Sequence, residues 1–356
     1  MRSRSLERLV SARRHVTAAS DRSWPLALGS GLALILWLGP GATATAPDGW
    51  QHGGSPASLR SEIPIVREEH YTLDGRVRPL LLFWIGRSDI GDARLTWRDD
   101  GSGRRAFELL IGSDPLRAPR QINRWGFILE TLERDRADTL GIMKESSEDT
   151  LEEAEVSIAG ETGGMTIFKA SRSTISGDTA SGGTMTIAAP ATLTYRDLDE
   201  LLVVLPAAPS QLRTVTVPAG TKTGFLAALD TLIGLSMEPC RRRNGDGDVA
   251  DVPYVYNQTL YDLSLESCDH EPRFETRVGV FRDVVDGRFA VKNRATRKET
   301  RFRMMYEASG TDRGVPVRAI FRPHWWIEVE LLRANPATTR AHDTVLSTAT
   351  PGRSRG

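Results

Sequence analysis

Short runs in which apolar and polar residues alternate recur through most of the chain. Two such runs, 93–98 and 106–111, lie on either side of an Asp-Asp-Gly-Ser-Gly turn cluster. Because successive side chains of a strand point to opposite faces, each run predicts a half-buried strand, and the pair predicts a β-hairpin. Similar or shorter apolar runs predict strands over 80–85, 121–132, 165–169, 184–187, 192–195, 201–205, 254–256, 260–265, 273–282, 289–292, 301–306, 315–321 and 325–332.

One segment, 222–234, has a helical pattern instead. Thr221 or Thr223 can cap the start of this helix, and Gly234 can end it. Helical spacing places its large apolar residues on one face: Phe225, Leu226, Leu229, Leu232 and Ile233.

Many short strands separated by turn signals are typical of an antiparallel barrel or sandwich. We therefore expect a mostly β fold: a single antiparallel open barrel or curved sheet, with its main helix near 221–234. The chain shows no tandem repeat and no interior linker, so we expect one β-rich domain over 61–335. The Gly-, Pro- and Ser-rich segment 47–60 is expected to be a linker. Segment 336–356, rich in Thr, Ala and Arg, is expected to be a disordered tail.

The first 46 residues have the pattern of an export signal. Arginines precede an apolar, uncharged stretch over 25–38. A membrane-spanning helix needs about 20 such residues, so this stretch is short, and its two glycines also disfavour an uncleaved anchor. Two Ala-Thr-Ala sequences follow, ending at Ala44 and Ala46, and both match the small-residue pattern of cleavage sites. We expect residues 1–46 to be a signal peptide, and the mature chain to be periplasmic or secreted without a transmembrane helix.

Composition and charge limit the function classes. The 356-residue chain is 40% hydrophobic and 26% charged, which is ordinary for a globular protein with a substantial core. It carries 46 basic and 46 acidic residues, and loss of the six arginines and two acidic residues of the leader leaves a net charge of −4. Nucleic-acid binding needs a clustered basic surface, so no nucleic acid is expected among the partners.

Cys240 and Cys268 are the two cysteines of the chain. In an exported protein an even number of cysteines usually pairs, so we expect a disulfide, with two buried free thiols as the alternative. A loop of about 29 residues closed in this way adds roughly 3–4 kcal/mol of stability in the chain-entropy description. Neither cysteine lies in a Cys-x-x-Cys motif, so no catalytic role is expected.

No motif in the sequence fixes a reaction. G-x-S-x-G, H-E-x-x-H, G-x-G-x-x-G and the phosphate-binding loop with its lysine are all missing. Of the six histidines, His70, His270 and His324 fall in the folded part, and none has a ligand pattern near it. We therefore expect no catalytic residues and no cofactor.

Two polar segments are weak candidates for a cation site. The acidic segment 145–155 is better explained as a solvated loop or short helix. Asn244-x-Asp246-x-Asp248 resembles the start of a calcium loop, but Val255 stands at the twelfth position, where a bidentate glutamate is needed. We expect no metal.

Two tryptophan-containing stretches are the candidates for contact with a ligand or partner. In segment 112–126, Arg124 precedes Trp125, and a buried arginine beside tryptophan can clamp an anion or stack on the ring. The alternative is a structured loop that closes one end of a barrel. Trp325 and Trp326 are adjacent in a predicted strand, so they point to opposite faces. One belongs in the core, and the other at a rim or groove, where it contacts lipid or peptide or protects the sheet edge.

Several segments of the second half follow one another in a distinctive order. A strand near 201–205 precedes Val-Pro-Ala-Gly-Thr at 217–221, which opens the helix. Val-Tyr-Asn-Gln-Thr-Leu-Tyr-Asp-Leu at 255–263 follows, and the final strands contain Val-Pro-Val at 315–317 and end in the aromatic run 325–332. In this order, residues 200–332 resemble the periplasmic β-spiral proteins of the cell-envelope integrity (EipB-like) class and related uncharacterised exported families.

The resemblance implies an open, curved antiparallel sheet around a helix, related to the barrels of lipoprotein carriers. In that class the helix commonly sits in the concave face. Asn257-Gln258 stands where the class usually has Asp-Gly, so the turn there is expected to differ. The resemblance carries over no catalytic residues, and it covers the first half only through the strand pattern.

Together these features predict an exported, non-enzymatic bacterial envelope protein that binds a protein, lipid or lipoprotein partner in the periplasm. A secreted hydrolase with an unrecognised site is one alternative, and it would require carboxylates that converge with His270 or His324. An outer-membrane β-barrel is another alternative, which the short strands and the polar C-terminal segment disfavour. The sequence leaves the oligomeric state open.

Overall fold

The computed structural model describes residues 60, 62–77, 85–144, 164–206, 209, 212–242, 251–324 and 327–334. The expected signal peptide, most of the expected linker and the expected tail lie outside these residues. Within them, 14 strands form one antiparallel sheet. Their bounds are β1 Ile65–Val77, β2 Ile85–Asp99, β3 Arg105–Ser113, β4 Trp125–Leu132, β5 Arg136–Lys144, β6 Met165–Ser176, β7 Thr179–Pro190, β8 Arg213–Thr216, β9 Val252–Tyr256, β10 Thr259–Thr276, β11 Gly279–Asn293, β12 Glu299–Glu307, β13 Pro316–His324 and β14 Ile327–Arg333.

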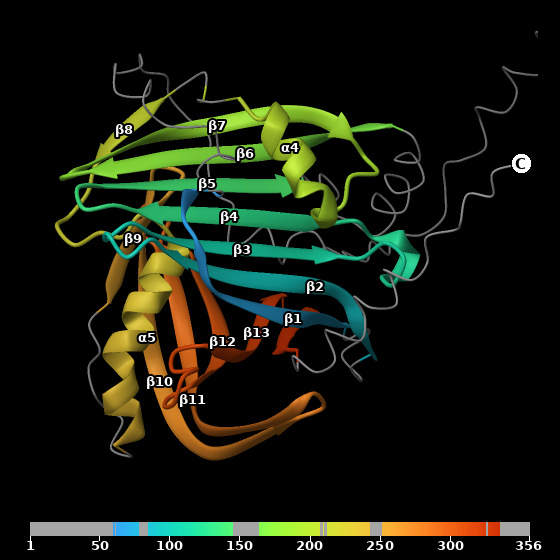
Figure 1. The fold of residues 1–356 in the computed structure, drawn as a ribbon, viewed down its shortest axis with the longest axis vertical. Helices are drawn as coiled ribbons and strands as arrows, with labels where there is room; N and C mark the ends of the chain where they lie inside the picture. The colour runs from blue at the N-terminus through green and yellow to red at the C-terminus, as the bar shows by residue number, and fades with distance from the viewer. Residues whose placement is uncertain are drawn as a thin grey trace, which may run out of the picture.

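The sheet consists of two meanders. Strands β1 to β8 lie side by side in chain order, strands β9 to β14 do the same, and β1 pairs with β14 to join the two sets. The edge strands are therefore β8 and β9, which follow one another in the chain. Figure 1 shows the β9–β14 meander turning away from the β1–β8 layer, so that the sheet curves around a helix. The predicted mostly β fold, with an open, curved antiparallel sheet, is confirmed.

Two α-helices cover opposite faces of the sheet. Helix α5 (Phe225–Arg241) lies on the concave face, against β3, β4 and β9–β12. Helix α4 (Leu198–Val204) lies on the outer face of β3–β7. Strand β4 is buried on both sides because Phe127 faces the α4 cluster and Ile128 faces α5. This double burial explains its continuous apolar sequence, which alternation alone does not predict.

The predicted helix near 221–234 starts later than expected. Helix α5 begins at Phe225 after an extended Gly224, and no side chain at the N-cap position bonds to it. The hydroxyl of Thr223 lies 3.0 Å from that of Thr139 on β5 instead of capping the helix. The expected threonine cap is therefore wrong, because the sheet supplies the acceptor for the helix start.

The expected end at Gly234 is also wrong. Helix α5 continues through Gly234 and Pro239 to Arg241. Met237 and Cys240 continue the buried face of the helix, so packing against the sheet outweighs the unfavourable helix propensity of glycine. The helix therefore brings Cys240 to the concave face.

Segments 192–195 and 201–205, both predicted as strands, form the turn before α4 and α4 itself. A capping box starts this region: the Asp197 carboxylate accepts from the Thr194 N–H at 2.8 Å, and the Thr194 hydroxyl oxygen accepts from a backbone N–H of the first turn. Leu198, Leu201 and Leu202 then face the sheet at helical spacing. A short apolar run does not distinguish strand from helix, and here the capping residues decide.

The predicted strand 273–282 is interrupted by the turn that joins β10 to β11. Thr276 shapes this turn, since its hydroxyl donates to the Gly279 carbonyl and accepts from the Val278 N–H. Side-chain hydrogen bonds of this kind replace the usual Gly or Asn turn signal. Strand β5 was absent from the prediction, although it lies between β4 and β6 in the sheet.

Candidate functional site: the concave face of the sheet

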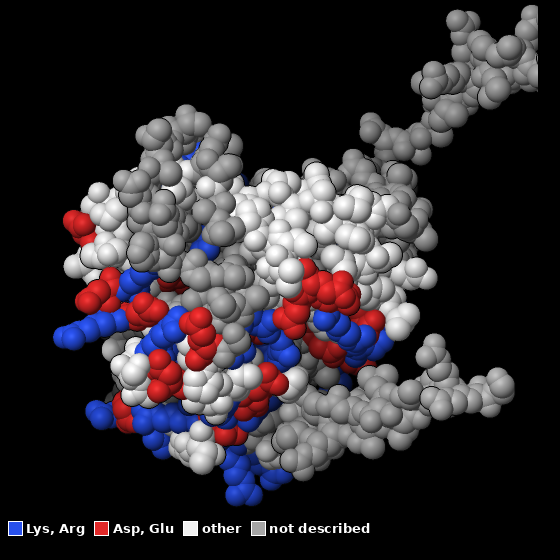
Figure 2. Space-filling model, turned by 45° about the horizontal axis from the view of Figure 1, so that its top comes forward, with Lys and Arg blue, Asp and Glu red and all other residues white. Residues whose placement is uncertain are grey.

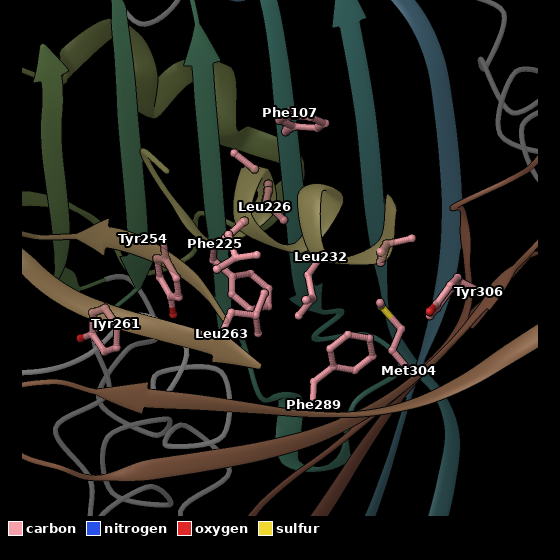
Figure 3. Packing of buried hydrophobic residues seen from close by; sticks show 14 of the residues in the cluster. Phe107, Phe225, Leu226, Leu232, Tyr254, Tyr261, Leu263, Phe289, Met304 and Tyr306 are labelled. Carbon is pink, nitrogen blue, oxygen red and sulfur yellow. The ribbon is translucent and has the colours of Figure 1, made fainter. Parts of the chain in front are cut away.

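Helix α5 fills one side of the concave face (Figure 3). Its apolar side chains, Phe225 and Leu232 among them, meet buried residues of β3, β4 and β9–β12. The ring of Phe225 lies edge-on to that of Tyr254, with centroids 6.0 Å apart, and Phe289 stacks on Phe302 at 5.0 Å. This side of the concave face is therefore a close-packed core.

Glu130 of β4 holds the N-terminus of α5. Its carboxylate oxygens accept hydrogen bonds from the backbone N–H groups of Leu226 at 2.8 Å and Ala227 at 2.7 Å. These N–H groups have no acceptor inside the helix, so the carboxylate acts as the cap. Burial raises the pKa of Glu130 to about 7, against the opposing effect of the two N–H groups. The site needs glycine at 224, because a Cβ there would lie 2.2 Å from Glu130 Oε1.

The far end of α5 is tied to the sheet covalently. Cys240 forms the expected disulfide with Cys268 of β10, with the two Cα atoms 5.7 Å apart. One turn earlier, the hydroxyls of Ser236 and Tyr306 lie 2.9 Å apart in the core. The helix is therefore anchored by a buried carboxylate at its start and by a disulfide near its end.

The two edges of the sheet approach one another beside α5. Lys222, which follows β8, bridges to β9 through a backbone bond from its N–H to the Pro253 carbonyl at 2.8 Å. The turn between β9 and β10 then reaches β6, where the Gln258 amide donates to Ser173 Oγ at 3.1 Å. Gly182 of β7 is required beneath this turn, since a Cβ would lie 2.0 Å from Gln258 Nε2. The sheet thus curls until its ends touch, but no strand pairing between β8 and β9 closes it.

The contact depends on the two central residues of the turn between β9 and β10. Asn257 and Gln258 have φ values of +46° and +56°, which suit a two-residue hairpin with both central residues left-handed. A glycine at 258 would adopt this conformation more easily, but it would lack the amide that binds Ser173.

Beyond this contact, the concave face of β6 and β7 is exposed. Met165 and Ile167 of β6 are 66% and 48% exposed. On β7, Ala188 lies opposite Ile167, Thr186 opposite Lys169 and Thr184 opposite Ser171, and these three β7 residues are exposed. The concave face therefore has a filled side under α5 and an open side over β6 and β7, where Lys169 lies among apolar and small polar residues.

Charged residues are distributed unevenly. On the face opposite α5, strands β11–β14 carry ion pairs such as Arg318–Glu330 at 2.7 Å and Arg303–Asp286. Figure 2 shows acidic and basic residues interspersed over the lower part of the visible surface, whereas the described surface above them is mostly uncharged. Strand β7 contains no Asp, Glu, Lys or Arg.

Trp125 lies away from the concave face. Trp125 is 1% exposed in the cluster beneath α4, where its ring packs on Phe168 at 5.2 Å and its Nε1 donates to the Leu193 carbonyl. Arg124 is also buried, and its guanidinium donates to the Asn123 carbonyl. Both residues occupy a structured region at the β3–β4 end, as the loop interpretation of this stretch proposes.

A charge network holds the same loop. The Arg117 guanidinium donates to Asp89, Asp92 and Asp114 at 2.5, 2.5 and 3.0 Å. These carboxylates raise the pKa of Arg117 against the opposing effect of burial. The loop between β3 and β4 is therefore fixed to β2.

Some candidates fall outside the described residues. These are Trp325 and Trp326, the acidic segment 145–155 and the calcium-like sequence at 244–248. Within the described residues, no cluster of three His, Cys, Asp or Glu side chains could hold a metal ion. No helix in the same part of the chain is long and apolar enough to cross a membrane.

The hydrolase alternative depends on the surroundings of the histidines. His270 Nε2 lies 2.7 Å from Asp283 Oδ1, and Arg241 contacts the same carboxylate at 3.3 Å. Hydrogen bonding from Ser309 is the largest cause of the lowered pKa of Asp283. The carboxylate thus stands between serine and histidine, whereas activation of a serine nucleophile needs the imidazole in that position. His70 lies 3.1 Å from Glu68 on the surface, and the side chain of His324 is outside the described set.

Of the two anchors of α5, sequence reasoning predicted the disulfide and missed Glu130. Glu130 lies in an apolar strand, and a lone acidic residue in such a context is a signal of a specific buried partner. The open edge of β7 has a weaker signal, a twelve-residue strand without charge.

Comparison with known proteins adds one structural likeness. No protein-family model matches the chain. A search of curated proteins also finds no match. Among solved structures, the chain is similar to a beta-barrel-like protein of a domain of unknown function, DUF1849, from Brucella abortus. The TM-score is 0.35 with 7% sequence identity, over 77% of this chain and 96% of that one. The description of the fold above is based on the strand order and pairing of this chain.

Proposed function

We propose that the protein is an exported, non-enzymatic envelope protein that binds a partner protein outside the cytosol. The leader pattern and the Cys240–Cys268 disulfide support export, because disulfides persist in oxidising compartments. The partner is proposed to be a protein, or the protein part of a lipoprotein.

One observation favours a protein over a lipid. A lipid carrier needs an apolar space inside its curved sheet, but α5 occupies that space, with Leu232 and Phe289 both fully buried. Removing α5 from the concave face would expose this core and break the bonds of Glu130 and the disulfide. An acyl chain would have to replace a helix that is anchored at both ends.

The open side of the concave face is the proposed contact surface. It combines the exposed Met165 and Ile167 with small threonine and alanine side chains on β7. A surface with scattered apolar side chains and a single lysine, Lys169, among the described residues of β6 and β7 that line it suits contact with another polypeptide.

Photo-crosslinking in the envelope of the native host tests this proposal. A photoreactive residue is placed at Ile167, and in a matched control at Val280, which is 53% exposed on β11. We expect an adduct with a different polypeptide from position 167 and not from position 280. Equal labelling at both positions, or stoichiometric lipid extracted from the purified mature protein, would contradict the proposal.

Fractionation tests the compartment separately. With and without reductant, thiol labelling should find both cysteines blocked in a periplasmic, shortened chain. Full-length chain in the cytosol with two free thiols would overturn the export part of the proposal.

A further inference from the structure

Two backbone bonds define which residues of β7 point to its open edge. The Ala191 N–H donates to the Gly164 carbonyl on the β6 side, at 2.9 Å. On the β8 side, the Val217 N–H donates to the Asp178 carbonyl, at 2.7 Å. Since hydrogen bonding alternates along an antiparallel strand and the β6–β7 register has no shift, odd-numbered residues of β7 bond to β6 and even-numbered residues point away from it.

Strand β8 uses only the first part of this edge. It pairs with Thr179, Ala180, Ser181 and Gly182. Among the described residues, no strand pairs with the remaining edge of β7. Thr184, Thr186 and Ala188 therefore direct a row of N–H and C=O groups outward, and Pro190 ends the row because it has no N–H.

Within the described residues, this edge has none of the usual protection against pairing with another chain. Exposed edges are commonly blocked by charged side chains, inward-pointing charges or bulges, and the edge over 184–188 has none of these. The edge strand β9, at the opposite end of the sheet, differs from this part of β7: Lys222 bridges to it, and Pro253 lies within it. The contrast singles out β7 as the edge that is available.

Apolar side chains are exposed on both sides of this edge. On the concave side they are Met165 and Ile167 of β6. On the outer side, α4 starts near β3, where Tyr195 lies against Gly112, and the chain leaves it toward β8. Figure 1 shows the helix crossing the sheet up to β7. Its last turn carries Val203 and Val204, which are 76% and 60% exposed.

We propose that this edge pairs with the same edge of a second copy of the chain, so that two sheets join into one across a two-fold axis. Only one register uses all three outward-pointing residues as both donors and acceptors. It places Thr186 opposite Thr186 of the partner subunit, and Thr184 opposite Ala188 of the partner subunit. Shifting by two residues in either direction would use Pro190, which lacks a donor, or Gly182, which β8 already occupies.

Self-pairing fits the chemistry of the edge. A two-fold axis places identical residues opposite one another, so a charged residue at its centre would repel its copy, whereas opposed threonines pair favourably. On the outer side, the exposed Val203 and Val204 at the end of α4 would add buried area to the backbone bonds. This inference goes beyond the proposed function and does not require it.

Variants that place like or opposite charges at position 186, on the proposed two-fold axis, test the proposal. Light scattering during gel filtration of the mature, disulfide-intact protein should give twice the chain mass. Thr186→Glu and Thr186→Lys should each weaken dimerisation at least about tenfold because like charges would face each other. An equimolar mixture of the two variants should restore the dimer. Val280→Glu, a charge placed on another exposed apolar residue, should leave the dimer unchanged.

Thr186→Pro is a second test of the same interface, since it removes an outward-pointing N–H donor without adding charge and should also weaken dimerisation. Circular dichroism shows whether each variant is folded, and the two charged variants remain decisive if the proline variant does not fold. A wild-type monomer at all concentrations, or a dimer that neither charged variant weakens, would overturn the proposal. A monomer that still crosslinks to a different protein would leave the proposed function standing without this interface.

Discussion

The two meanders of the sheet differ in how their faces are covered. Strands β9–β12 bury their concave face against α5, which Glu130 and a disulfide hold in place, and the opposite face carries ion pairs. Strands β5–β7 reverse this arrangement: their outer face is buried under α4, and much of the concave face of β6 and β7 is exposed. One region is therefore closed by its own helix, while the other presents exposed strand surface.

The largest expected effect comes from shortening one core side chain in the closed region. Phe289→Ala removes a fully buried ring between α5 and the sheet, and it should lower the free energy of unfolding by about 3–5 kcal/mol. Chemical denaturation measures this. The matched change Ile167→Ala, in the open region, should lower it by less than about 1 kcal/mol, because little apolar area is buried there. Equal losses would remove the distinction between the regions.

The next effect concerns the covalent anchor. Cys240→Ser combined with Cys268→Ser should lower the free energy of unfolding by roughly 3–4 kcal/mol, since the loop closed by the disulfide gains entropy when unfolded. Hydrogen exchange should rise in α5 more than in β4–β6. If instead the exchange rises first in β6 and β7, then the disulfide does not act by anchoring the helix.

Glu130 should give the closed region a pH dependence. Its pKa rises from 4.5 in the unfolded chain to about 7 in the fold. The folded protein therefore binds the proton more tightly, so Glu130 stabilises the fold most below pH 4.5, and this contribution falls as the pH rises to 7. The change amounts to about 3 kcal/mol.

Denaturation of wild type and Glu130→Gln between pH 5 and 8 isolates this contribution. The difference between their unfolding free energies should vary with pH, because glutamine does not titrate. Burial raises the pKa of Asp312, but its hydrogen bonds and ion pairs with Arg333 and Arg67 outweigh this effect and lower the pKa to about 2. Asp312 therefore titrates below this pH window. A difference that stays constant from pH 5 to 8 would show that Glu130 is not buried at the helix start.

The smallest effect is expected from the exposed ion pairs. Arg301→Gln breaks pairs with Glu266 and Glu299 on an open face, and such fully exposed pairs contribute little to stability because solvent screens them. The loss should shrink further in high salt. A loss comparable to that of the disulfide would mean that charge, more than apolar burial, stabilises the β10–β12 region.

The local patterns of the chain predict the strands well where one face is exposed. Alternation locates parts of β2, β7 and β12, and in β7 exposed and buried residues alternate from Thr184 to Pro190. It also locates β3, although both faces of that strand are buried. It fails for segment 201–205, where a capping box four residues upstream of Leu198 turns an apolar run into α4.

The anchors of the concave face could be predicted only in part. Cysteine pairing needs no geometry, so the Cys240–Cys268 disulfide follows from composition and compartment. The contact between Glu130 and the start of α5 joins residues 96 positions apart, and no local pattern indicates it. The same holds for Gln258 above Gly182, which depends on how far the sheet curls.

Hydrogen exchange of α5 tests the central claim most directly, namely that this helix permanently fills the concave face. In the oxidised mature protein, amides from Ala228 to Met237 should exchange only through global unfolding, at rates matching the core of β4 and β11. Exchange in this segment as fast as in exposed loops, or slowed only when an amphiphile is added, would contradict the account. It would show that the helix leaves the concave face and that the space it occupies is a ligand site.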